Sequence, residues 1–482
     1  MIKKTFCLIV ALGMVISFSA CKKSNTSSDS STYSSSEAEN SDGSASAQGS
    51  ETQNSSEASN TSGKSESASS GKTVSRATSG NVNGGLSGVP KSLKGTTLTI
   101  YSWNVLNDVP GANNLIKTFQ SKTGIKVKWL VGSYDNYQSE IAAMVAAKNS
   151  PDIIRMRGVV PGTLSLMDPI TVSGYDFKDS AWDSFVSQTY TFNGKTYAVN
   201  LKNTLLQQPL TMFYNTELIA KYDLSDPYTI WMKNKSDWNW DKFIEICRQY
   251  KSAAGSDSTP WTLNLYTDYA MTYGASVIKR DGNKFVSGMG DSTLLKGFQK
   301  MAEFKSEKLW SDRWDMNGFN TGKYLFFGPA IISARKAQFQ LTDLKAKGAL
   351  GVVPYPCVPG QSTYYQNIFE VEAYGIPKGA KNAEAVPYFL RYYLDADNYN
   401  ENQFFNDKKI LNVYKYCMTK TTLVPEYSRH LMLYSSCSDE YTKLNTQLLS
   451  AGPNQIQSIL NSYEPVVQRA LKEQNQAISA LK

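Results

Sequence analysis

The sequence predicts an α/β fold in which helices cover the faces of a parallel sheet. Within residues 97–156, stretches with every second residue apolar alternate with stretches whose apolar residues recur at helical spacing. Strand, helix, strand, helix, strand is the order typical of a parallel sheet. About 390 residues follow the low-complexity N-terminal segment, which is more than one hydrophobic core usually serves. We therefore expect two domains.

The segment from Thr97 to Met156 carries the pattern. We predict strands at 97–103 and 125–131 and a third, short strand starting at 153. The helix after the first strand presents Leu115, Ile116 and Phe119 on one face, and Gly124 stands where a helix C-cap is expected. A second helix begins near residue 137 and precedes Pro151.

The remaining chain continues to alternate strands and helices. Asn193-Gly194 predicts a hairpin turn. Asn239 or Asp241 is expected to cap a helix that starts near residue 238. Further strands are predicted at 210–214, 262–266, 323–327, 351–355 and 371–376, and further helices at 217–220, 294–309, 384–393 and the C-terminal end.

The N-terminus has the features of a secretory signal. Lys3 and Lys4 precede an apolar run, residues 5–18, that is too short to span a bilayer, and Ser19-Ala20 supply small residues before Cys21. We expect residues 1–20 to be a signal peptide. This pattern resembles that of bacterial lipoproteins, in which the cysteine after the cut is lipidated, although Phe18 replaces the leucine usual three residues before it. The alternative is an ordinary signal peptide cut nearby.

Residues 21–90 are expected to form a lipidated cysteine followed by a disordered, Ser-rich tether. Tyr33 is the only large apolar residue from Ser24 to Thr73, so this stretch cannot bury enough surface to offset its chain entropy. A flexible chain of roughly 65 residues has an r.m.s. span of about 45 Å. Palmitate-type acyl chains on Cys21 would hold the protein on the outer side of the cell membrane.

The charge of the chain points to no particular partner. The formal net charge is +8, but the basic residues are spread along the sequence rather than gathered in runs. We expect no nucleic-acid partner.

Cysteines and histidine are too few and too scattered for a metal site. Cys247, Cys357, Cys417 and Cys437 remain beyond the tether without a Cys-x-x-Cys pair, and His430 is the only histidine. We expect no metal and no cofactor. A Cys417–Cys437 disulfide and buried free thiols both remain open.

Catalytic motifs are missing from the sequence. It contains no Gly-x-Ser-x-Gly elbow and no phosphate loop, and one histidine does not favour a His-based triad. A secreted glycosidase needs only two positioned carboxylates, so counting acids does not exclude it. We expect a binding protein rather than an enzyme. The 9 Trp and 29 Tyr suit stacking on sugar rings.

An ordered set of short phrases supports a family assignment. The phrases are Leu-Thr-Ile-Tyr-Ser-Trp at 98–103, Phe-Gln-Ser-Lys-Thr-Gly-Ile-Lys-Val at 119–127, Ser-Pro-Asp-Ile-Ile at 150–154, Asn-Gly-Lys-Thr-Tyr-Ala at 193–198, Phe-Tyr-Asn-Thr at 213–216, Trp-Asn-Trp-Asp at 238–241 and Gly-Ile-Pro-Lys-Gly-Ala-Lys-Asn at 375–382. In this order they resemble the extracellular solute-binding protein family 1, the sugar-binding lipoproteins of bacterial ABC importers. The resemblance covers roughly residues 96–482.

The resemblance implies a two-lobe, periplasmic-binding-protein-like (type II) fold with crossing strands and a cleft between the lobes. One lobe would contain residues 96–205 and 330–372, and the other residues 208–328 and 375–482. Crossings are expected near 205–208, 328–329 and 372–375. The implied function is a monomeric, lipid-anchored subunit that binds a carbohydrate, expected to be an oligosaccharide, and delivers it to the membrane subunits of an ABC permease.

Family position also implies ligand-binding residues. In the first lobe, the ends of the first and third strands and the start of the second helix are expected to face the cleft. In the second lobe, a loop after residue 263 and a position before the last helix are candidates. The expected residues are Trp103, Asn104, Asp108, Tyr137, Arg157, Asn264, Tyr266, Asp268 and Tyr463. For Trp103 and Tyr137 the alternative is a place in the core, and for Arg157 a surface position or an ion pair.

One position departs from the family pattern. Maltose-binding protein has a stacking Trp after the Gly-Pro of its crossing, where this sequence has Ala330. A binding protein for a non-sugar solute therefore stays an alternative. Ferric iron held by tyrosines is disfavoured, because Tyr364-Tyr365 has no histidine nearby. A wall or adhesion lipoprotein with the same fold also remains open.

Overall fold

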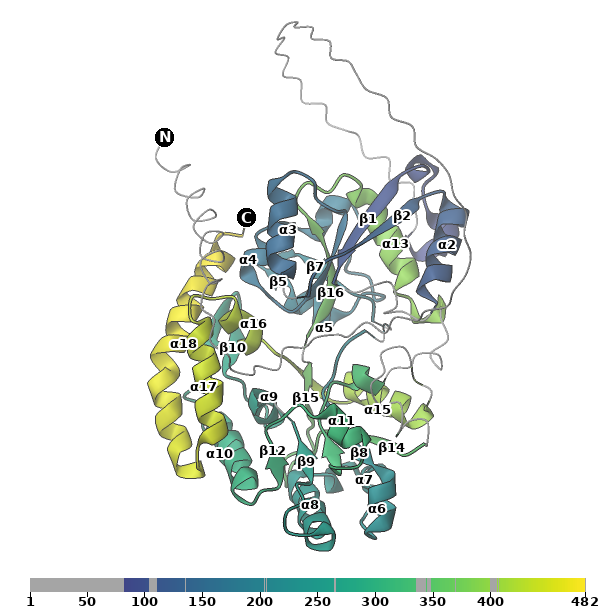
Figure 1. Ribbon diagram of the computed structural model, residues 1–482. Helices are drawn as coiled ribbons and strands as arrows, with labels where there is room; N and C mark the ends of the chain where they lie inside the picture. The colour runs from purple at the N-terminus through teal and green to yellow at the C-terminus, as the bar shows by residue number, and fades with distance from the viewer. Residues whose placement is uncertain are drawn as a thin grey trace, which may run out of the picture. The chain divides into compact units, whose positions relative to one another are not determined.

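The structure is a computed structural model. It describes residues 82–103, 111–134, 136–202, 204, 206–263, 266–334, 344, 348–368, 370–398, 405 and 407–481, and all of them belong to one folded unit (Figure 1).

The first sheet contains the predicted parallel strands. It consists of β1 (Thr97–Ser102), β2 (Lys126–Val131), β3 (Ile153–Arg157), β4 (Met167–Asp168), β7 (Ala198–Val199) and β16 (Glu372–Pro377). The order is β2-β1-β3-β16-β4, with β7 also paired to β16. β1 runs parallel to β2 and β3, as predicted, whereas β16 runs antiparallel to β3.

Helices cover both faces of this sheet. α2 (Ala112–Thr123) and α13 (Val386–Tyr393) pack together through the rings of Phe119 and Phe389, while α3 (Tyr137–Ala146) lies on the other side of β1 (Figure 1). Gly124 caps α2 with a φ of 74°, as predicted. The short elements of this lobe are η1 (Val82–Gly88), η2 (Lys91–Leu93), α4 (Pro161–Leu164), η4 (Ile170–Ser173), α5 (Ser184–Thr189), β5 (Thr191–Phe192) and β6 (Lys195–Thr196).

The second sheet has the order β12-β9-β13-β8-β14. Its strands are β8 (Thr211–Asn215), β9 (Trp261–Thr262), β12 (Trp310–Ser311), β13 (Phe326–Phe327) and β14 (Leu350–Pro354). The helices around it are α6 (Thr216–Lys221), α7 (Pro227–Lys233), α8 (Trp240–Ala254), α9 (Tyr266–Met271), α10 (Ser292–Ser306), α11 (Met316–Asn320) and α15 (Lys408–Thr419). Asn239 caps α8, since its side chain accepts from the Lys242 amide.

The C-terminal part joins the two sheets. A hairpin, β10 (Ile278–Asp281) and β11 (Lys284–Ser287), packs near α16 (Ser428–Leu433), α17 (Ser438–Ser450) and α18 (Ile456–Ser479). β15 (Tyr365–Ile368) pairs in parallel with β17 (Thr422–Pro425), which leads into α16. We call the elements around the first sheet the first lobe, and the second sheet with the C-terminal helices the second lobe.

Three connecting segments lie side by side between the sheets. The Leu210 amide donates to the Asn367 carbonyl at 3.1 Å, and the Ile331 amide donates to the Pro209 carbonyl at 2.9 Å. Isolated bridges join Leu210 to Ala330 and Pro209 to Ile368. This backbone ladder holds together three connecting segments that are far apart in the sequence.

The strand pairing differs from the predicted division of the chain into lobes. β14, assigned to the first lobe, pairs with β8 of the second sheet, and β16 with α13, assigned to the second lobe, belongs to the first sheet. The third crossing therefore precedes residue 372 rather than following it. Pairing across more than a hundred residues leaves no local signal, because both strands are buried along their whole length and do not show which strand each one pairs with.

Two further predictions need correction. The strand predicted at 262–266 is limited to Trp261–Thr262, and residues 266–271 are helical instead of forming a loop. The strand predicted at 323–327 is limited to Phe326–Phe327.

Cys247, Cys357, Cys417 and Cys437 are free, buried thiols, so the structure contains no Cys417–Cys437 disulfide.

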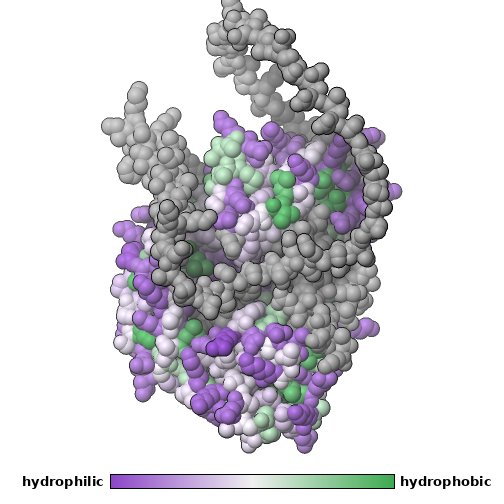
Figure 2. Space-filling model, viewed as in Figure 1, coloured by the Kyte–Doolittle hydropathy of each residue, from purple (hydrophilic) through white to green (hydrophobic). Residues whose placement is uncertain are grey.

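In Figure 2 hydrophobic residues appear on the visible face as small, separate areas. In the described part of the chain no helix has the length and apolarity needed to cross a bilayer. Among the residues with a described side chain, the large exposed hydrophobic ones are Val131, Val172, Met232, Val286 and Leu433.

A buried ion pair joins β3 to β16 and generates a stability prediction. Arg155 Nε lies 2.8 Å from Glu372 Oε2, and the side chains are 1% and 0% exposed. Arg155→Met leaves the carboxylate buried without its cation, so unfolding in urea should show a loss of about 3–5 kcal/mol. The matched control is Arg248→Met, whose pair with Glu307 is exposed and should cost less than about 1 kcal/mol. Equal losses would contradict this account.

Candidate functional site

The candidate site lies where β1 and β3 end, next to the connecting segments. Trp103 directly follows β1, and Arg157 is the last residue of β3. Because β1 and β3 are parallel neighbours, their carboxyl ends meet at one edge of the sheet. The glutamates at 370 and 372 lie opposite, since Arg157 pairs with Glu372 in the register of β3 and β16.

Two arginines stack on aromatic rings at this edge. The guanidinium carbon of Arg157 lies 3.4 Å from the ring centroid of Tyr134 and 5.4 Å from that of Trp103. The guanidinium carbon of Arg155 lies 4.5 Å from the Trp103 centroid. Tyr137 meets Trp103 edge-on at 5.1 Å between centroids. These cation–π and aromatic contacts fix the indole, which is 9% exposed, while Tyr134 stays half-buried.

Glu370 contacts both Arg157 and Tyr134, which stack on each other. Its Oε1 lies 3.1 Å from Arg157 Nη2 and accepts from the Tyr134 hydroxyl at 3.2 Å. Burial and the Glu370 carboxylate raise the pKa of Tyr134, so its hydroxyl stays protonated and donates. Burial also raises the pKa of Glu372, although Arg155 opposes this shift. Gln208 donates to Glu372 at 2.7 Å and connects the site to the first crossing.

His430 of α16 approaches the same carboxylate from the second lobe. Its Nε2 lies 4.0 Å from Glu370 Oε1, and the ring is 2% exposed. Gly158, with a φ of 102°, makes room for the ring, because a Cβ there would lie 2.8 Å from Nδ1. We call Tyr134, Arg157, Glu370 and His430 the interlobe cluster.

The imidazole is neutral. Burial, with Arg157 and Arg429 nearby, lowers the pKa of His430 well below its usual value. Among the described residues, neither ring nitrogen has a hydrogen-bond partner, and neither does Arg157 Nε. The cluster therefore contains three buried polar atoms that its own side chains do not satisfy, and leaving such atoms without hydrogen bonds costs stability.

Of the predicted binding residues, Trp103, Tyr137 and Arg157 come together. Tyr137 is 1% exposed, and its hydroxyl lies 2.8 Å from the Arg155 carbonyl and 3.0 Å from the Tyr101 carbonyl. The structure thus places Tyr137 in the core beneath Trp103. Arg157 forms an ion pair with Glu370, the alternative given for it.

Of the other predicted binding residues, the structure describes the side chain of Tyr463 alone. Tyr463 is half-buried on α18. Cys21, Asn104, Asp108 and Asn264 lie outside the described residues, as do the side chains of Tyr266 and Asp268.

Sequence reasoning missed three members of the cluster. Tyr134 follows β2 closely, so the rule that placed Trp103 at a strand end also points to it. Glu370 and His430 carry no such signal, because Glu370 meets Arg157 across more than two hundred residues of sequence and His430 reaches the cluster through Glu370.

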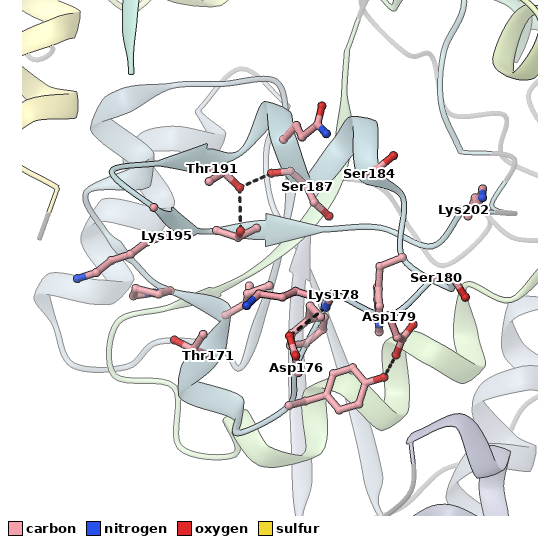
Figure 3. Close-up of a pocket in the computed structure, with 18 residues that line it drawn as sticks. Thr171, Asp176, Lys178, Asp179, Ser180, Ser184, Ser187, Thr191, Lys195 and Lys202 are labelled. Atoms are coloured by element: carbon pink, nitrogen blue, oxygen red, sulfur yellow. Dashed lines mark hydrogen bonds between the residues drawn. The ribbon is translucent and has the colours of Figure 1, made fainter. Parts of the chain in front are cut away.

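A separate pocket lies within the first lobe (Figure 3). It has a volume of about 520 Å³ and is formed by η4, α5 and the β5–β6 hairpin. Its floor includes Tyr175, Phe177 and Trp182, with Lys178 and Lys195 among its polar residues. Phe177 and Trp182 pack on each other at 4.7 Å between centroids and are 8% and 4% exposed, so little aromatic surface is open. None of the predicted binding residues lines this pocket.

Metal ligation finds no support in the described part of the chain. No group of three or more histidine, cysteine, aspartate or glutamate side chains there could hold an ion.

Comparison with known proteins decides the family. Residues 114–413, more than half of the chain, match the family described as bacterial extracellular solute-binding protein. The chain belongs to this family. Its members are solute-binding proteins and not enzymes, and the resemblance deduced from the sequence is confirmed. No curated protein matches the sequence.

Solved structures share the fold at low identity. The GacH receptor of Streptomyces glaucescens, solved unliganded and with acarbose, gives a TM-score of 0.58 at 16% identity, covering 78% of this chain and 99% of its own. The sugar-binding protein MalE of Xanthomonas citri gives 0.56 at 12% identity, covering 80% and 98%. The ABC substrate-binding protein Lmo0181 of Listeria monocytogenes, solved with cycloalternan, gives 0.51 at 14% identity, covering 80% and 98%. These similarities confirm the two-lobe fold.

The buried His430 predicts a specific pH dependence of stability. The pKa of His430 is lower in the folded than in the unfolded state. Its contribution to the unfolding free energy is therefore fully present above the unfolded pKa of about 6.5 and is lost as the pH falls below that value. Between pH 7.5 and 5.5 the wild type should lose about 1.4 kcal/mol of unfolding free energy through this group. His430→Gln should remove that loss. Because His430 is the only histidine, urea unfolding at both pH values isolates the effect. The same change in unfolding free energy between the two pH values in the wild type and in His430→Gln would contradict a buried neutral imidazole.

Proposed function

We propose that this solute-binding protein captures a carbohydrate, an oligosaccharide rather than a single sugar, and delivers it to the membrane subunits of an ABC permease. The observation that carries the proposal is the interlobe cluster, in which polar groups from the first lobe, a connecting segment and the second lobe meet at one carboxylate. A solute that bonds to all three parts favours the arrangement in which the lobes are close.

The chemistry of the cluster suits sugar hydroxyls. Arg157 offers planar N–H donors, Glu370 offers two acceptor oxygens, and neighbouring hydroxyls of a sugar pair with such groups two at a time. The half-buried ring of Tyr134 provides an apolar face for the C–H side of a pyranose. This assigns Tyr134 the stacking role that Ala330 cannot take.

The charges of the cluster favour an uncharged ligand. Arg157 is paired with Glu370, and the lowered pKa of His430 keeps the imidazole neutral. A charged solute would have to displace one partner of a buried ion pair, which is costly.

The relatives support the sugar assignment. The solved structures that share the fold include one with acarbose, one with cycloalternan and one named as a sugar-binding protein. In contrast, the adjacent Tyr364 and Tyr365 do not favour iron, because the Tyr364 hydroxyl donates to the Trp238 carbonyl at 3.0 Å within the core.

We infer the anchoring from the sequence. A signal peptide at 1–20, Cys21 as the lipidated residue and the Ser-rich tether that follows place the folded part outside the cell membrane and near a permease. The protein would act as a monomer, since one chain supplies the whole interlobe cluster.

Thermal unfolding of the mature chain with a panel of mono- and oligosaccharides tests the function. A ligand that binds only the native state raises stability by RT ln(1 + [L]/Kd), about 2.7 kcal/mol at 100 Kd. One class of oligosaccharide should raise the midpoint by several degrees. Tyr134→Ala should weaken that sugar at least tenfold, because it removes both the ring and the hydroxyl.

Lys178→Ala, in the pocket of Figure 3, is the matched control and should leave the affinity unchanged. A loss of affinity with Lys178→Ala and none with Tyr134→Ala would move the site to that pocket. If peptides, polyols or metal ions raise the unfolding midpoint and no sugar does, the fold assignment stands and the assignment of a carbohydrate ligand is wrong.

A further inference from the structure

The fold collects lysines that are scattered in the sequence. Four turns lie at the end of the first sheet where β1, β2 and β3 begin: residues 91–97, 122–126, 148–153 and 377–384. Every lysine in them is exposed. We call these residues the lysine pole: Lys91, Lys94, Lys122, Lys126, Lys148, Lys378 and Lys381.

Hydrogen bonds join the four turns into one surface. The Gly95 amide donates to the Gly124 carbonyl at 2.9 Å. The Asn382 side chain donates to the Thr97 carbonyl at 3.0 Å, and the Ser150 hydroxyl donates to the Lys378 carbonyl at 2.6 Å. The seven ammonium groups therefore belong to one contiguous end of the lobe.

The charge of this surface is not balanced locally. The four turns contain seven lysines and two acids, Asp152 and Glu384. Asp152 is 3% exposed and its carboxylate accepts from the Thr99 and Asn382 backbone amides, so it is buried and bonded to the backbone rather than to a lysine.

The lysines of the pole differ from those of the second lobe in their ion pairs. In the second lobe several lysines are paired with carboxylates. Within the described residues, no lysine of the pole has an ion-pair partner; Lys378 donates to the Ser165 carbonyl. An exposed, unpaired group of one sign attracts an extended surface of the opposite sign.

The pole and the interlobe cluster lie at opposite ends of the same strands. β1 begins at Thr97 beside the pole and ends at Ser102, next to Trp103. Six residues of strand span roughly 20 Å. A partner can therefore cover the pole while the site stays open.

We propose that the lysine pole docks the first lobe on the anionic phospholipid surface of the membrane. The proposal goes beyond solute binding and uses the proposed lipid anchor only to bring the chain near the bilayer. Anionic headgroups form a dense, continuous sheet of charge, and each lysine within a Debye length of it strengthens binding about fivefold. Docked in this way, the lobe holds its ligand site roughly 20 Å above the headgroups.

The acidic residues of the chain's own tether are the competing occupant. Seven acids lie between residues 29 and 66, but no two of them are adjacent. Holding them on the pole would cost chain entropy for every exposed ion pair formed, and such pairs contribute little. The membrane surface, whose charges are already dense, is the better match.

Sedimentation with lipid vesicles tests the proposal. The protein is the mature chain with Cys21→Ala, which removes the lipid, and the vesicles contain equal phosphatidylglycerol and phosphatidylcholine, or phosphatidylcholine alone. The chain should bind only the anionic vesicles and should be released by 0.5 M salt, about a 4 Å Debye length. Replacing Lys94, Lys122, Lys126 and Lys381 by Gln should lower the partition coefficient at least tenfold.

A matched variant separates the pole from net charge. It replaces four exposed lysines of the second lobe by Gln, namely Lys233, Lys296, Lys420 and Lys472. It should bind anionic vesicles as the wild type does. Both variants should keep the sugar-induced rise in unfolding temperature, so a loss of membrane binding is distinct from a failure of solute binding.

Three results would overturn the docking surface. Equal losses in the two variants would assign binding to overall charge. Equal binding to neutral vesicles would exclude an electrostatic surface. If the chain binds anionic vesicles only after the seven tether acids are replaced by Asn or Gln, the tether is the occupant of the pole.

Discussion

Two ion pairs between β3 and the start of β16 hold the rest of the site in place. Arg155 with Glu372 and Arg157 with Glu370 join the first sheet to the segment that crosses from the second lobe. Buried charges of this kind are tolerated only when each has its partner and its remaining hydrogen bonds. The cost of separating them fixes the guanidinium groups, and the fixed guanidinium groups in turn orient Trp103 and Tyr134.

The same pairs connect local packing to movement of the lobes. Glu370 belongs to the third crossing and Glu372 begins β16 directly after it; the neighbours of this crossing at Pro209 and Ala330 form a continuous backbone ladder. Gln207 and Gln208 add side-chain bonds from the first crossing to Glu372. A solute at Glu370 therefore acts on the residues that link the lobes, which is how binding energy can shift the balance between open and closed forms.

Local signals explain what the sequence predicts well. Gly124 and Asn193-Gly194 determine their turns through positive φ angles, which depend on residue type at one position. Trp103 and Arg157 lie at the ends of β1 and β3, as the sequence predicts, because the end of a strand is visible in the local pattern. By contrast, the partners of β14 and β16, and the meeting of Glu370 with His430, depend on contacts between distant segments. The lysine pole is another case, since its seven members come from four separate turns.

The central claim is that solute joins the two lobes, and a distance between them tests it most directly. Spin labels at Lys128→Cys and Lys233→Cys report across the lobes, while labels at Lys233→Cys and Lys296→Cys report within the second lobe. Both proteins also carry Cys21→Ala, and the thiols of Cys247, Cys357, Cys417 and Cys437 are buried and should stay unlabelled. The account predicts that the bound oligosaccharide shifts the first distance distribution and leaves the second unchanged. Saturating sugar with neither distribution changed would contradict it.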